Sequence, residues 1–432
     1  MSYSEAVAHL DALGVDAMKA MSPSLDRMRA LCDAMGNPQH QFPSIHITGT
    51  NGKTSVARIT TSLVQELGLT VGTFTSPHLH TVRERIALGG EPVTEAVFGD
   101  AFAHLKPYLD HVENKLDEPL TYFEVLTGMF FLWASDQPVD VAVVEVGLGG
   151  MWDATNVMDG SIAVLTNIDL DHTSMLGMDR LTIAKEKVGI IKDGSTVVTG
   201  ERLVDVLKEI SDAADAAKAS LSVLDRDFGL VENRLAVDGR LISVRTHARD
   251  YDDVFLPLHG VHQGTNAAIS LEAVTSFLPE ESLEDDVVAA GLANAQVPGR
   301  MERINKVLFD VAHNPSGMSA FVTSIQEEFA PEEAIFVVGF LSDKDYKGML
   351  REIARTPCRR LIATRPDSPR AVDPKEVQTF AEELEFECSV EENVAAALDA
   401  AVAQAEGQRL VSVTGSHYVV GEAREYWLKA TN

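Results

Sequence analysis

The residues best suited to chemistry lie in one glycine-rich stretch, where Gly49 and Gly52 enclose two polar residues and Lys53 and Thr54 follow. Glycines let a backbone turn tightly enough for consecutive N–H groups to converge on one anion, and a following helix aims its N-terminus at the same point. Lys53 adds a positive charge for the outer phosphates of a nucleotide, and Thr54 carries a hydroxyl where P-loops use one to hold Mg²⁺. A strict P-loop needs a glycine at the position of Ile47, so the stretch predicts a shortened P-loop. Its expected nucleotide-binding residues are Gly49, Thr50, Asn51, Gly52, Lys53, Thr54 and Ser55.

A second candidate, Glu145, lies near the end of a nearly continuous apolar run at residues 139–147, which is typical of a central parallel strand. A carboxylate in such a run is costly unless it is paired or binds a metal. Glu145 is therefore a candidate metal ligand, and a structural ion pair is the alternative. The glycine-rich residues 147–150 that follow let the chain pass close to a ligand before it reaches Asp153.

Polar residues also follow two other predicted strands. His172 comes after a strand at 162–166, and Ser76 and His78 come after a strand at 70–75. In an open α/β sheet, ligands bind at the carboxyl ends of the strands, so these side chains are expected near the phosphate-binding loop. A lone histidine is more often structural than metal-binding, and the pair Ser76-Pro77 alone is typical of a plain turn.

Hydrophobic spacing, glycines and prolines place these residues on alternating strands and helices. The strand before the phosphate-binding loop begins at Ile45, and Gly68 ends the helix after it. Helices are predicted at residues 4–10, 25–35, 56–67, 121–135, 180–191, 262–277 and 283–294. The helix at 180–191 contains Lys185, Glu186 and Lys187, which are most simply interpreted as a solvated charged face.

The rest of the chain divides at a compact break over residues 297–300. Before it, residues 197–257 predict short strands, turns and one helix, with a hairpin turn at Asp238-Gly239. After it, strands alternate with helices, which predicts a small parallel α/β domain. The predicted strands are 307–311, 334–340, 360–364 and 410–414, and the predicted helices are 316–329, 347–354, 374–384 and 394–406.

Composition limits the classes of partner. A net charge of -29 over 432 residues opposes nucleic acid and anionic membranes, because both need a concentrated basic field. Three scattered cysteines predict neither a disulfide framework nor a thiolate metal site. Residues 1–10 do not have the pattern of a signal peptide, and the most apolar run, 125–134, is shorter than the about 20 residues of a membrane helix. We therefore expect a cytoplasmic protein without nucleic-acid or membrane partners.

Taken together, the motifs resemble the folylpolyglutamate synthase and dihydrofolate synthase family of the Mur ligase superfamily, in the right order and over nearly the whole chain. The matching motifs are Gly49-Thr50-Asn51-Gly52-Lys53, Thr75-Ser76-Pro77-His78, Glu145-Val146-Gly147-Leu148-Gly149-Gly150, Asp153-Ala154-Thr155-Asn156, Asp171-His172, Glu186-Lys187-Val188-Gly189-Ile190, His262-Gln263 with Asn266, and Asp310-Val311-Ala312-His313-Asn314-Pro315. The resemblance implies an α/β protein in which a P-loop ATPase domain with a mostly parallel sheet, residues 1–296, precedes a linker at 297–299. A smaller Rossmann-like domain at residues 300–432 would close over it.

The resemblance also implies roles for individual residues. The implied Mg²⁺ ligands are Thr54, Ser76, Glu145 and His172, and the implied catalytic residues are Lys53, Lys187, Asp310 and His313. Lys187 matches the carboxylated lysine of the family. Asn266 and Arg300 resemble nucleotide contacts, and Phe123, Asp153 and His78 resemble residues that bind the substrate. The chain departs from the family at Met151, where members often carry Arg, and at Thr54, where many have Gly.

The implied activity is an ATP- and Mg²⁺-dependent ligase that adds L-glutamate to dihydropteroate and to the glutamate tail of reduced folates through an acyl phosphate. A monofunctional folylpolyglutamate synthase is the first alternative. A cell-wall Mur ligase is a second, although only about fifty residues precede Lys53, too few for the separate domain such enzymes usually carry there. A nucleotide-dependent switch is a third, but it leaves Lys187 and the small domain unexplained. The resemblance implies a monomer.

Overall fold

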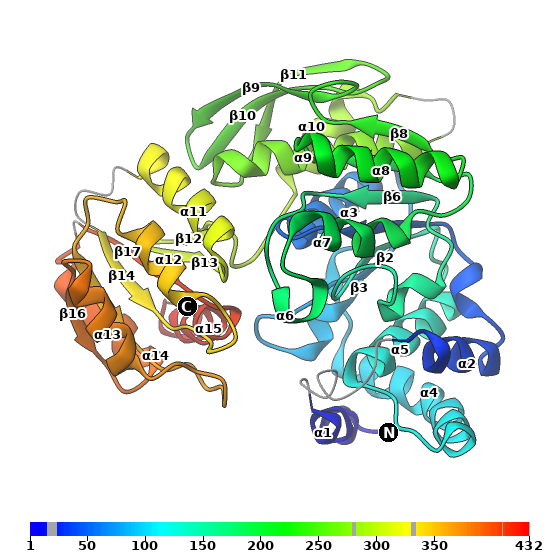
Figure 1. The fold of residues 1–432 in the computed structure, drawn as a ribbon, viewed down its shortest axis with the longest axis horizontal. Coiled ribbons are helices and arrows are strands. Elements are labelled where there is room, and N and C mark those ends of the chain that lie inside the picture. The colour runs from blue at the N-terminus through cyan, green and yellow to red at the C-terminus, as the bar shows by residue number, and fades with distance from the viewer. Residues whose placement is uncertain (15–23, 279–281, 330–333, 408, 432) are drawn as a thin grey trace. The chain divides into compact units, whose positions relative to one another are not determined.

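The computed structural model describes residues 1–14, 24–278, 282–329, 334–407 and 409–431. It divides into two compact units, which are described separately (Figure 1). Unit 1 comprises Met1–Glu232, Ile242–Val254 and Thr265–Ala295, and unit 2 comprises Asn233–Leu241, Phe255–Gly264 and Gln296–Asn432. Two short segments that precede the predicted boundary at 297–299 therefore group with unit 2. The predicted domain limits themselves stay a prediction.

The described part of unit 1 is built on a sheet in the order β4-β3-β2-β5-β1-β6-β7-β8. Its strands are β1 Ser44–Thr48, β2 Val71–Phe74, β3 Ile86–Leu88, β4 Glu91–Pro92, β5 Val141–Glu145, β6 Ile162–Leu165, β7 Thr196–Thr199 and β8 Ser220–Val223. The six strands from β2 to β8 in this order pair in parallel, and β3 and β4 extend the sheet antiparallel. Ile47 is the register partner of Glu145, so the phosphate-binding loop after β1 and the end of β5 lie at one edge of the sheet.

Apolar residues of the sheet pack against two groups of helices. The helices of this part of the chain are α1 Tyr3–Leu13, α2 Asp26–Ala34, α3 Lys53–Glu66, α4 Glu95–Leu116, α5 Tyr122–Asp136, α6 Thr173–Leu176, α7 Arg180–Lys187, α8 Val204–Ala216, α9 Val261–Phe277 and α10 Asp285–Ala293. Val144 packs with α1, α2, α4 and α5, whereas Ala163 packs with α7 and α8. Because His46 is the register partner of both residues, all three side chains lie on the same face of the sheet.

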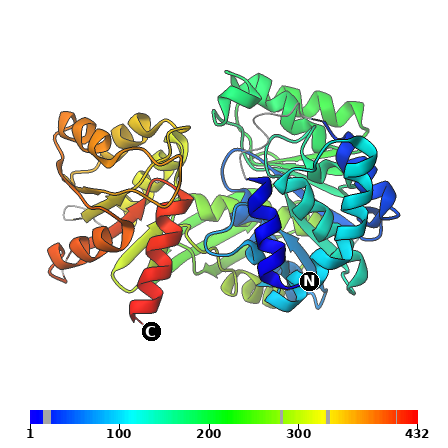
Figure 2. The ribbon, with the colours of Figure 1, turned by 90° about the horizontal axis from the view of Figure 1, so that it is seen from below.

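Helix α4 was not predicted, although its sequence carries the signal. Thr94 caps it by accepting the N–H of Val97, and its buried residues recur at helical spacing from Phe98 to Val112. Figure 2 shows α1, in dark blue, beside the cyan helices, and Tyr3 of α1 meets Phe98 of α4 with ring centroids 5.5 Å apart. The predicted hairpin is confirmed: β9 Gly229–Ala236 and β10 Gly239–Arg245 join at Asp238, which has a φ of 54°, and β11 Asp250–Leu256 completes this small sheet.

Unit 2 is a second α/β structure, with a sheet in the order β12-β13-β17-β14-β15-β16 in its described residues. Its strands are β12 Glu302–Ile304, β13 Val307–Asp310, β14 Ala334–Val338, β15 Arg360–Ala363, β16 Glu387–Val390 and β17 Leu410–Thr414. Its helices are α11 Pro315–Glu328, α12 Tyr346–Ile353, α13 Pro374–Glu383, α14 Val394–Gln404 and α15 His417–Thr431. The four predicted strands and their parallel pairing are confirmed, whereas the short edge strands β12 and β16 and helix α15 were not predicted.

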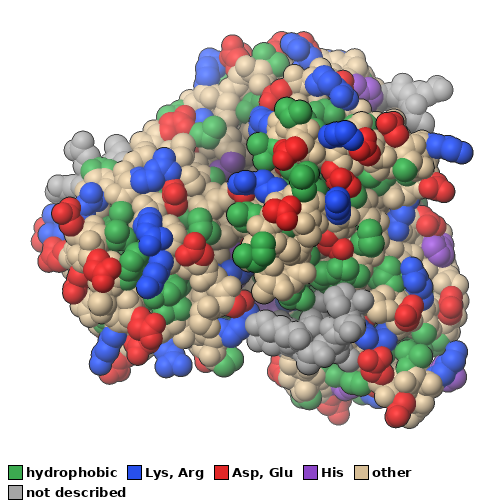
Figure 3. Space-filling view, in the orientation of Figure 1, with side chains coloured by type: hydrophobic (Ala, Val, Ile, Leu, Met, Phe, Trp, Pro, Cys, Tyr) green, Lys and Arg blue, Asp and Glu red, His purple; other side chains and the backbone are tan. Residues whose placement is uncertain are grey.

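The α/β fold class predicted from the sequence is confirmed, because both units are built on mostly parallel sheets. In the described residues, none of the helices is long and apolar enough to cross a membrane. Figure 3 shows Lys and Arg side chains interspersed with Asp and Glu on the visible face. A site for an anion must therefore be built locally, from backbone N–H groups and a few chosen cations.

Candidate active site

The phosphate-binding loop passes from β1 to α3, and both of its glycines are required by close approaches. Gly49 has a φ of +150°, and a Cβ there would lie 1.8 Å from Thr166 Oγ1. Gly52 has a φ of +84°, and a Cβ there would lie 2.8 Å from the side-chain oxygen of Asn266. The close approach at Gly52 brings Asn266, a predicted nucleotide contact, to the loop that is predicted to hold phosphates.

Two lysines converge on this loop. Lys53 Nζ donates to the carbonyl oxygens of Gly49, at 3.0 Å, and Thr50, at 3.2 Å, and Lys187 Nζ donates to the same Gly49 oxygen at 2.8 Å. Burial, followed by the charge of Lys53, lowers the pKa of Lys187 to about 7. Lys187 is only 4% exposed, so the interpretation of residues 185–187 as a solvated face is wrong for it. Its position in the last turn of α7 directs the side chain toward the loop instead of water.

Glu186, beside it, is also part of the site's framework. Its Oε1 accepts the N–H groups of Gly150 and Trp152, at 3.3 and 3.2 Å, so it holds the glycine-rich loop after β5. The side chain of Met151, between these two residues, is exposed. A charged pattern at helical spacing does not reveal this inward role, because the loop that uses Glu186 is distant in sequence.

Three of the four predicted metal ligands meet at the ends of neighbouring strands. Thr54 Oγ1 donates to the two carboxylate oxygens of Glu145, at 2.9 and 3.1 Å, and the N–H of Ser76 donates to Glu145 Oε2 at 3.1 Å. Glu145 is buried at the end of β5, as predicted. A carboxylate and hydroxyls are oxygen donors of the kind that Mg²⁺ prefers, so the donor set fits this ion.

His172, the fourth predicted ligand, lies between β6 and α6 with a φ of 48°. Its Nε2 is 3.9 Å from a carboxylate oxygen of Asp171. Among the residues that the structure describes, no group of three or more His, Cys, Asp or Glu side chains is placed to hold a metal ion. The metal-binding role of these residues therefore stays a prediction.

The glycine-rich loop after β5 is packed against the predicted substrate residues. A Cβ on Gly147 would lie 2.5 Å from the ring of Phe123, which leaves room only for glycine. Asp153 is buried and accepts the N–H of Leu148 at 2.9 Å and the N–H of Thr155 at 3.0 Å. Burial raises the pKa of Asp153 to about 6, although these hydrogen bonds act in the opposite direction.

His78, the third predicted substrate residue, is held by a neighbouring arginine. Arg85 Nε donates to His78 Nδ1 at 3.0 Å, and burial together with this positive charge lowers the pKa of His78 to about 4. The ring is therefore neutral at pH about 7, and Nε2 carries the proton. Glu84 was not predicted, yet its carboxylate accepts the N–H groups of residues 79–81 at 2.8 to 2.9 Å and so fixes this loop. The capping-box spacing from Thr81 to Glu84 is the signal that could have found it.

In unit 2, the predicted residues lie beside a histidine that was not predicted. Asp310, at the end of β13, is buried and accepts the N–H groups of Met301 and Ala312, each at 2.9 Å. Burial raises the pKa of Asp310 to about 6, while the charge of Arg300 opposes the shift. The rings of His313 and His417 are 4.9 Å apart, and a nitrogen of Arg300 lies 3.4 Å from His417 Nε2. His417 follows the strand paired with β13, so its place after a predicted strand could have marked it.

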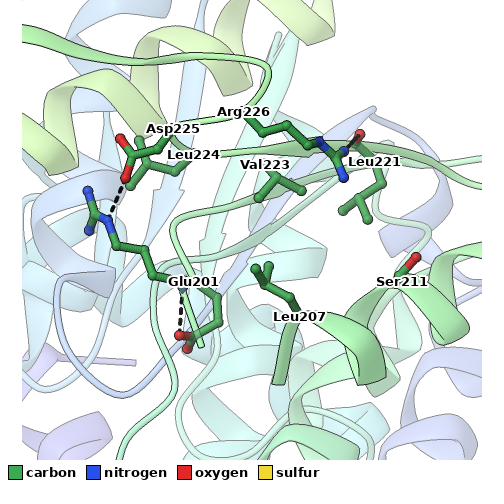
Figure 4. A pocket seen from close by; sticks show the side chains of 9 residues that line it. Glu201, Leu207, Ser211, Leu221, Val223, Leu224, Asp225 and Arg226 are labelled. Atoms are coloured by element: carbon green, nitrogen blue, oxygen red, sulfur yellow. Dashed lines mark hydrogen bonds and ion pairs between the residues drawn. The ribbon is translucent and has the colours of Figure 1, made fainter. Parts of the chain in front are cut away.

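A pocket of about 370 Å³ lies in unit 1, at the carboxyl ends of β7 and β8 (Figure 4). Leu207, Leu221 and Val223 point into it, and Arg202 pairs with Asp225 beside it at 2.6 Å. Its lining does not include a predicted site residue.

Comparison with known proteins places the chain in a family. Residues 47–274 match the Mur ligase middle domain, and residues 299–417 match the Mur ligase glutamate ligase domain. The dihydrofolate synthase/folylpolyglutamate synthase of Mycobacterium tuberculosis is 40% identical over 372 residues, which are 82% of this chain and 76% of that protein. The chain belongs to the folylpolyglutamate synthase and dihydrofolate synthase family of Mur ligases.

Solved structures of folylpolyglutamate synthases share the whole fold. That of Mycobacterium tuberculosis complexed with ADP has a TM-score of 0.92 and 36% identity, and the match covers 98% of this chain and 97% of that one. A complex of a folylpolyglutamate synthase with AMPPCP and folate has a TM-score of 0.86 and 30% identity, and the match covers 99% of this chain and all of that one. The resemblance inferred from the motifs is confirmed. This folylpolyglutamate synthase family member is an ATP-dependent ligase, as predicted, and not a nucleotide-dependent switch.

Proposed function

We propose that this protein joins L-glutamate to dihydropteroate and to the glutamate tail of reduced folates, with ATP as the source of energy. The observation that carries the proposal is the convergence of Lys53 and Lys187 on the Gly49 carbonyl, at the sheet edge where Thr54 meets Glu145. This arrangement supplies positive charge and oxygen donors where a triphosphate would lie on the loop. The names of relatives and the nucleotide and folate complexes of solved structures also support it.

The proposed reaction has two steps. A carboxylate oxygen of the pteroate or folyl substrate attacks the γ-phosphorus of ATP, the bond to the bridging oxygen breaks, and ADP leaves. The amine of glutamate then attacks the acyl phosphate carbon, phosphate leaves, and the amine loses a proton as the amide forms. Lys53 and the N–H groups of the first turn of α3, residues 53–55, offset the charge that develops on the transferred phosphoryl group, which is the main task of a phosphoryl-transfer site.

Metal and lysine chemistry complete the proposal. Thr54, Ser76, Glu145 and His172 would hold Mg²⁺, which when bound neutralises phosphate charge. Lys187, with a pKa of about 7, has a neutral amine available at neutral pH. That amine could attack CO₂ and lose a proton, and the carboxylated lysine so formed would be a further oxygen ligand. Mass spectrometry of the intact protein under native conditions would detect the added group.

The remaining predicted residues receive roles in the same reaction. We assign the pterin end of the substrate to Phe123, Asp153 and His78, and nucleotide binding to Asn266 and Arg300. Asp310 and His313 are proposed to act on the reacting groups from unit 2. The monomeric state expected from the sequence stays a prediction.

The test is ADP release by the purified protein with Mg²⁺, ATP and L-glutamate, with dihydropteroate in one reaction and tetrahydrofolate in another. Turnover with both substrates supports the bifunctional enzyme. Turnover only with tetrahydrofolate supports the monofunctional alternative, a folylpolyglutamate synthase. Release of ADP that does not depend on glutamate in either reaction would contradict the proposal.

A further inference from the structure

Three buried polar side chains of unit 1 form a chain of hydrogen bonds, and two of them, His46 and Thr155, have no role in the proposed reaction. His46 lies in β1, three residues before Gly49, and its Nε2 is 2.8 Å from Thr155 Oγ1. Thr155 Oγ1 in turn donates to Asp153 Oδ1 at 2.5 Å. All three side chains are buried. The strand that leads into the phosphate-binding loop is thus joined to the loop that carries Asp153.

The chemistry of the three groups fixes the direction of these hydrogen bonds. A threonine hydroxyl has one proton, and here that proton goes to the Asp153 carboxylate. The hydroxyl must therefore accept its second hydrogen bond, so His46 donates from Nε2. The other ring nitrogen, Nδ1, is buried without a hydrogen-bond partner among the described residues. This position suits a nitrogen without a proton, because a buried N–H without a partner would be costly. Burial, with a smaller effect of Lys192, lowers the pKa of His46 to about 3 and keeps the ring neutral.

The Asp153 carboxylate also bonds the glycine-rich loop after β5. Its Oδ2 accepts the N–H of Leu148, between Gly147 and Gly149. The same loop packs against Phe123, because only glycine at position 147 leaves room for the ring. A change at His46 can therefore alter the loop and Phe123 without touching either of them directly.

We propose that His46 is a positioning residue: through the Thr155 hydroxyl it fixes the Asp153 carboxylate, and with it the loop 147–150 that receives the pterin end of the substrate. This inference rests on the proposed function for the identity of the substrate. It assigns to His46 an effect on the binding of the pteroate or folyl substrate and not on the binding of ATP. His46 does not itself touch a reacting atom.

The kinetic test uses pairs of variants that differ only in the donor. His46→Phe removes the donor, His46→Asn moves it away from Thr155, and His46→Gln keeps a donor near the place of Nε2. Thr155→Val removes the hydroxyl and Thr155→Ser keeps it. We expect His46→Phe and Thr155→Val each to raise KM for dihydropteroate about tenfold, the effect of one buried hydrogen bond, with KM for ATP unchanged. His46→Gln and Thr155→Ser should stay close to the unaltered protein, and His46→Asn should resemble His46→Phe.

Coupling and a matched control separate positioning from general stability. KM for dihydropteroate in the double variant His46→Phe/Thr155→Val should be no higher than in the worse single variant, because both substitutions break the same chain of hydrogen bonds. Thr275→Val removes another buried threonine hydroxyl, which bonds the Leu271 carbonyl within α9, and it should leave both KM values unchanged. Equal rises in both KM values, additive effects, or failure of His46→Gln to restore the low KM in a folded protein would overturn the inference.

Nitrogen NMR of the histidine rings tests the chain of hydrogen bonds without any turnover. The signals assigned to His46 by their loss in His46→Gln should show a proton on Nε2 and a bare Nδ1 at neutral pH. A proton on Nδ1 would overturn the inference that His46 donates to Thr155. If the unaltered protein shows no turnover with dihydropteroate or a folate, the proposed function and the substrate assigned to the loop both fail, whereas the NMR result still decides the hydrogen-bond chain.

Discussion

At the scale of single residues, Lys53 is the side chain on which the proposed chemistry depends most. Its Nζ donates to the carbonyl oxygens of Gly49 and Thr50, so its charge is held at the phosphate-binding loop. We expect Lys53→Ala to reduce glutamate-dependent ADP release at least about 100-fold, the loss typical when a preorganised charge is removed from a transition state. Lys115→Ala, an exposed lysine in the last turn of α4, is the control and should not change the rate. A Lys53→Ala protein that is folded and nearly as active would refute the assignment.

Asp310 gives a pH-dependent prediction at the same scale. Its pKa is raised to about 6 in the folded protein from an ordinary value of 3.8, so the folded state binds more protons than the unfolded state between these values. The free energy of unfolding that Asp310 contributes is therefore highest below pH about 4 and falls as the pH rises toward about 6, by at most about 1.4 kcal/mol per pH unit.

The measurement is urea unfolding of the unaltered protein and of Asp310→Asn from acid to neutral pH. As the pH rises from about 4 to about 6, the unfolding free energy of the unaltered protein should fall relative to that of Asp310→Asn. Above this range the difference between the two proteins should become constant. A difference that does not change with pH, or that shifts in favour of the unaltered protein, would show that the pKa of the Asp310 carboxyl is not raised in the folded protein.

What the sequence could reveal about single residues depended on how local their chemistry is. Lys53, Thr54 and Glu145 were found because a glycine turn and a charge in an apolar strand are unusual by themselves. The burial of Lys187 was not found, because it depends on a loop distant in sequence. His46 was not found either, because a single histidine in an apolar strand carries no signal of its partner Thr155.

At the scale of elements, the loop after β5 packs closely against helix α5. A Cβ on Gly147 would lie 2.5 Å from the Phe123 ring, so Gly147→Ala must displace the ring or the loop. We expect Gly147→Ala to lower the free energy of unfolding by about 1–3 kcal/mol. Gly229→Ala is the matched control, because its new Cβ would meet its neighbours at ordinary distances of 3.5 to 3.7 Å.

Denaturant unfolding of a small set of variants checks this contact. Phe123→Ala removes the ring, so adding Gly147→Ala to it should cost much less than adding Gly147→Ala to the unaltered protein. The same cost in both backgrounds would mean that the Phe123 ring is not what excludes a side chain at Gly147.

The sequence predicted the central strands and most helices, and it missed short edge strands and helix α4. The central strands were predicted because they are continuous apolar runs, and all of them are present within a few residues of the expected bounds. The edge strands β12 and β16 are short and half-exposed, so they lack such a run. Helix α4 was missed in spite of its regular spacing, which its long polar face and internal Pro107 obscure.

At the scale of the whole molecule, a buried ion-pair cluster joins two short segments to the main part of unit 2. Arg240 is fully buried, and its guanidinium bonds Glu328 of α11, whose other carboxylate oxygen lies 3.0 Å from His259 Nδ1. Segments Asn233–Leu241 and Phe255–Gly264 are joined in this way to the main part of unit 2. This grouping is not predictable from the sequence, because it depends on side-chain pairs about 70 to 90 residues apart.

Removing one partner of this cluster should therefore be costly. We expect Arg240→Met to lower the free energy of unfolding by about 3–5 kcal/mol, because it leaves the buried Glu328 carboxylate without its guanidinium. Arg245→Met removes an exposed pair with Asp250 and should cost at most about 1 kcal/mol. Calorimetry of the two variants compares these losses, and equal losses would show that the Arg240 cluster contributes no more than a surface pair.

In the proposed reaction, ATP activates the carboxylate of a pteroate or folyl substrate for attack by glutamate. The most direct measurement uses a substrate whose carboxylate carries heavy oxygen, followed by mass spectrometry of the phosphate released. One heavy oxygen should pass from each carboxylate to phosphate, and the product should gain one glutamyl residue. Phosphate without heavy oxygen, released together with a glutamylated product, would contradict the acyl phosphate, and release of phosphate without any such product would contradict the ligase activity itself.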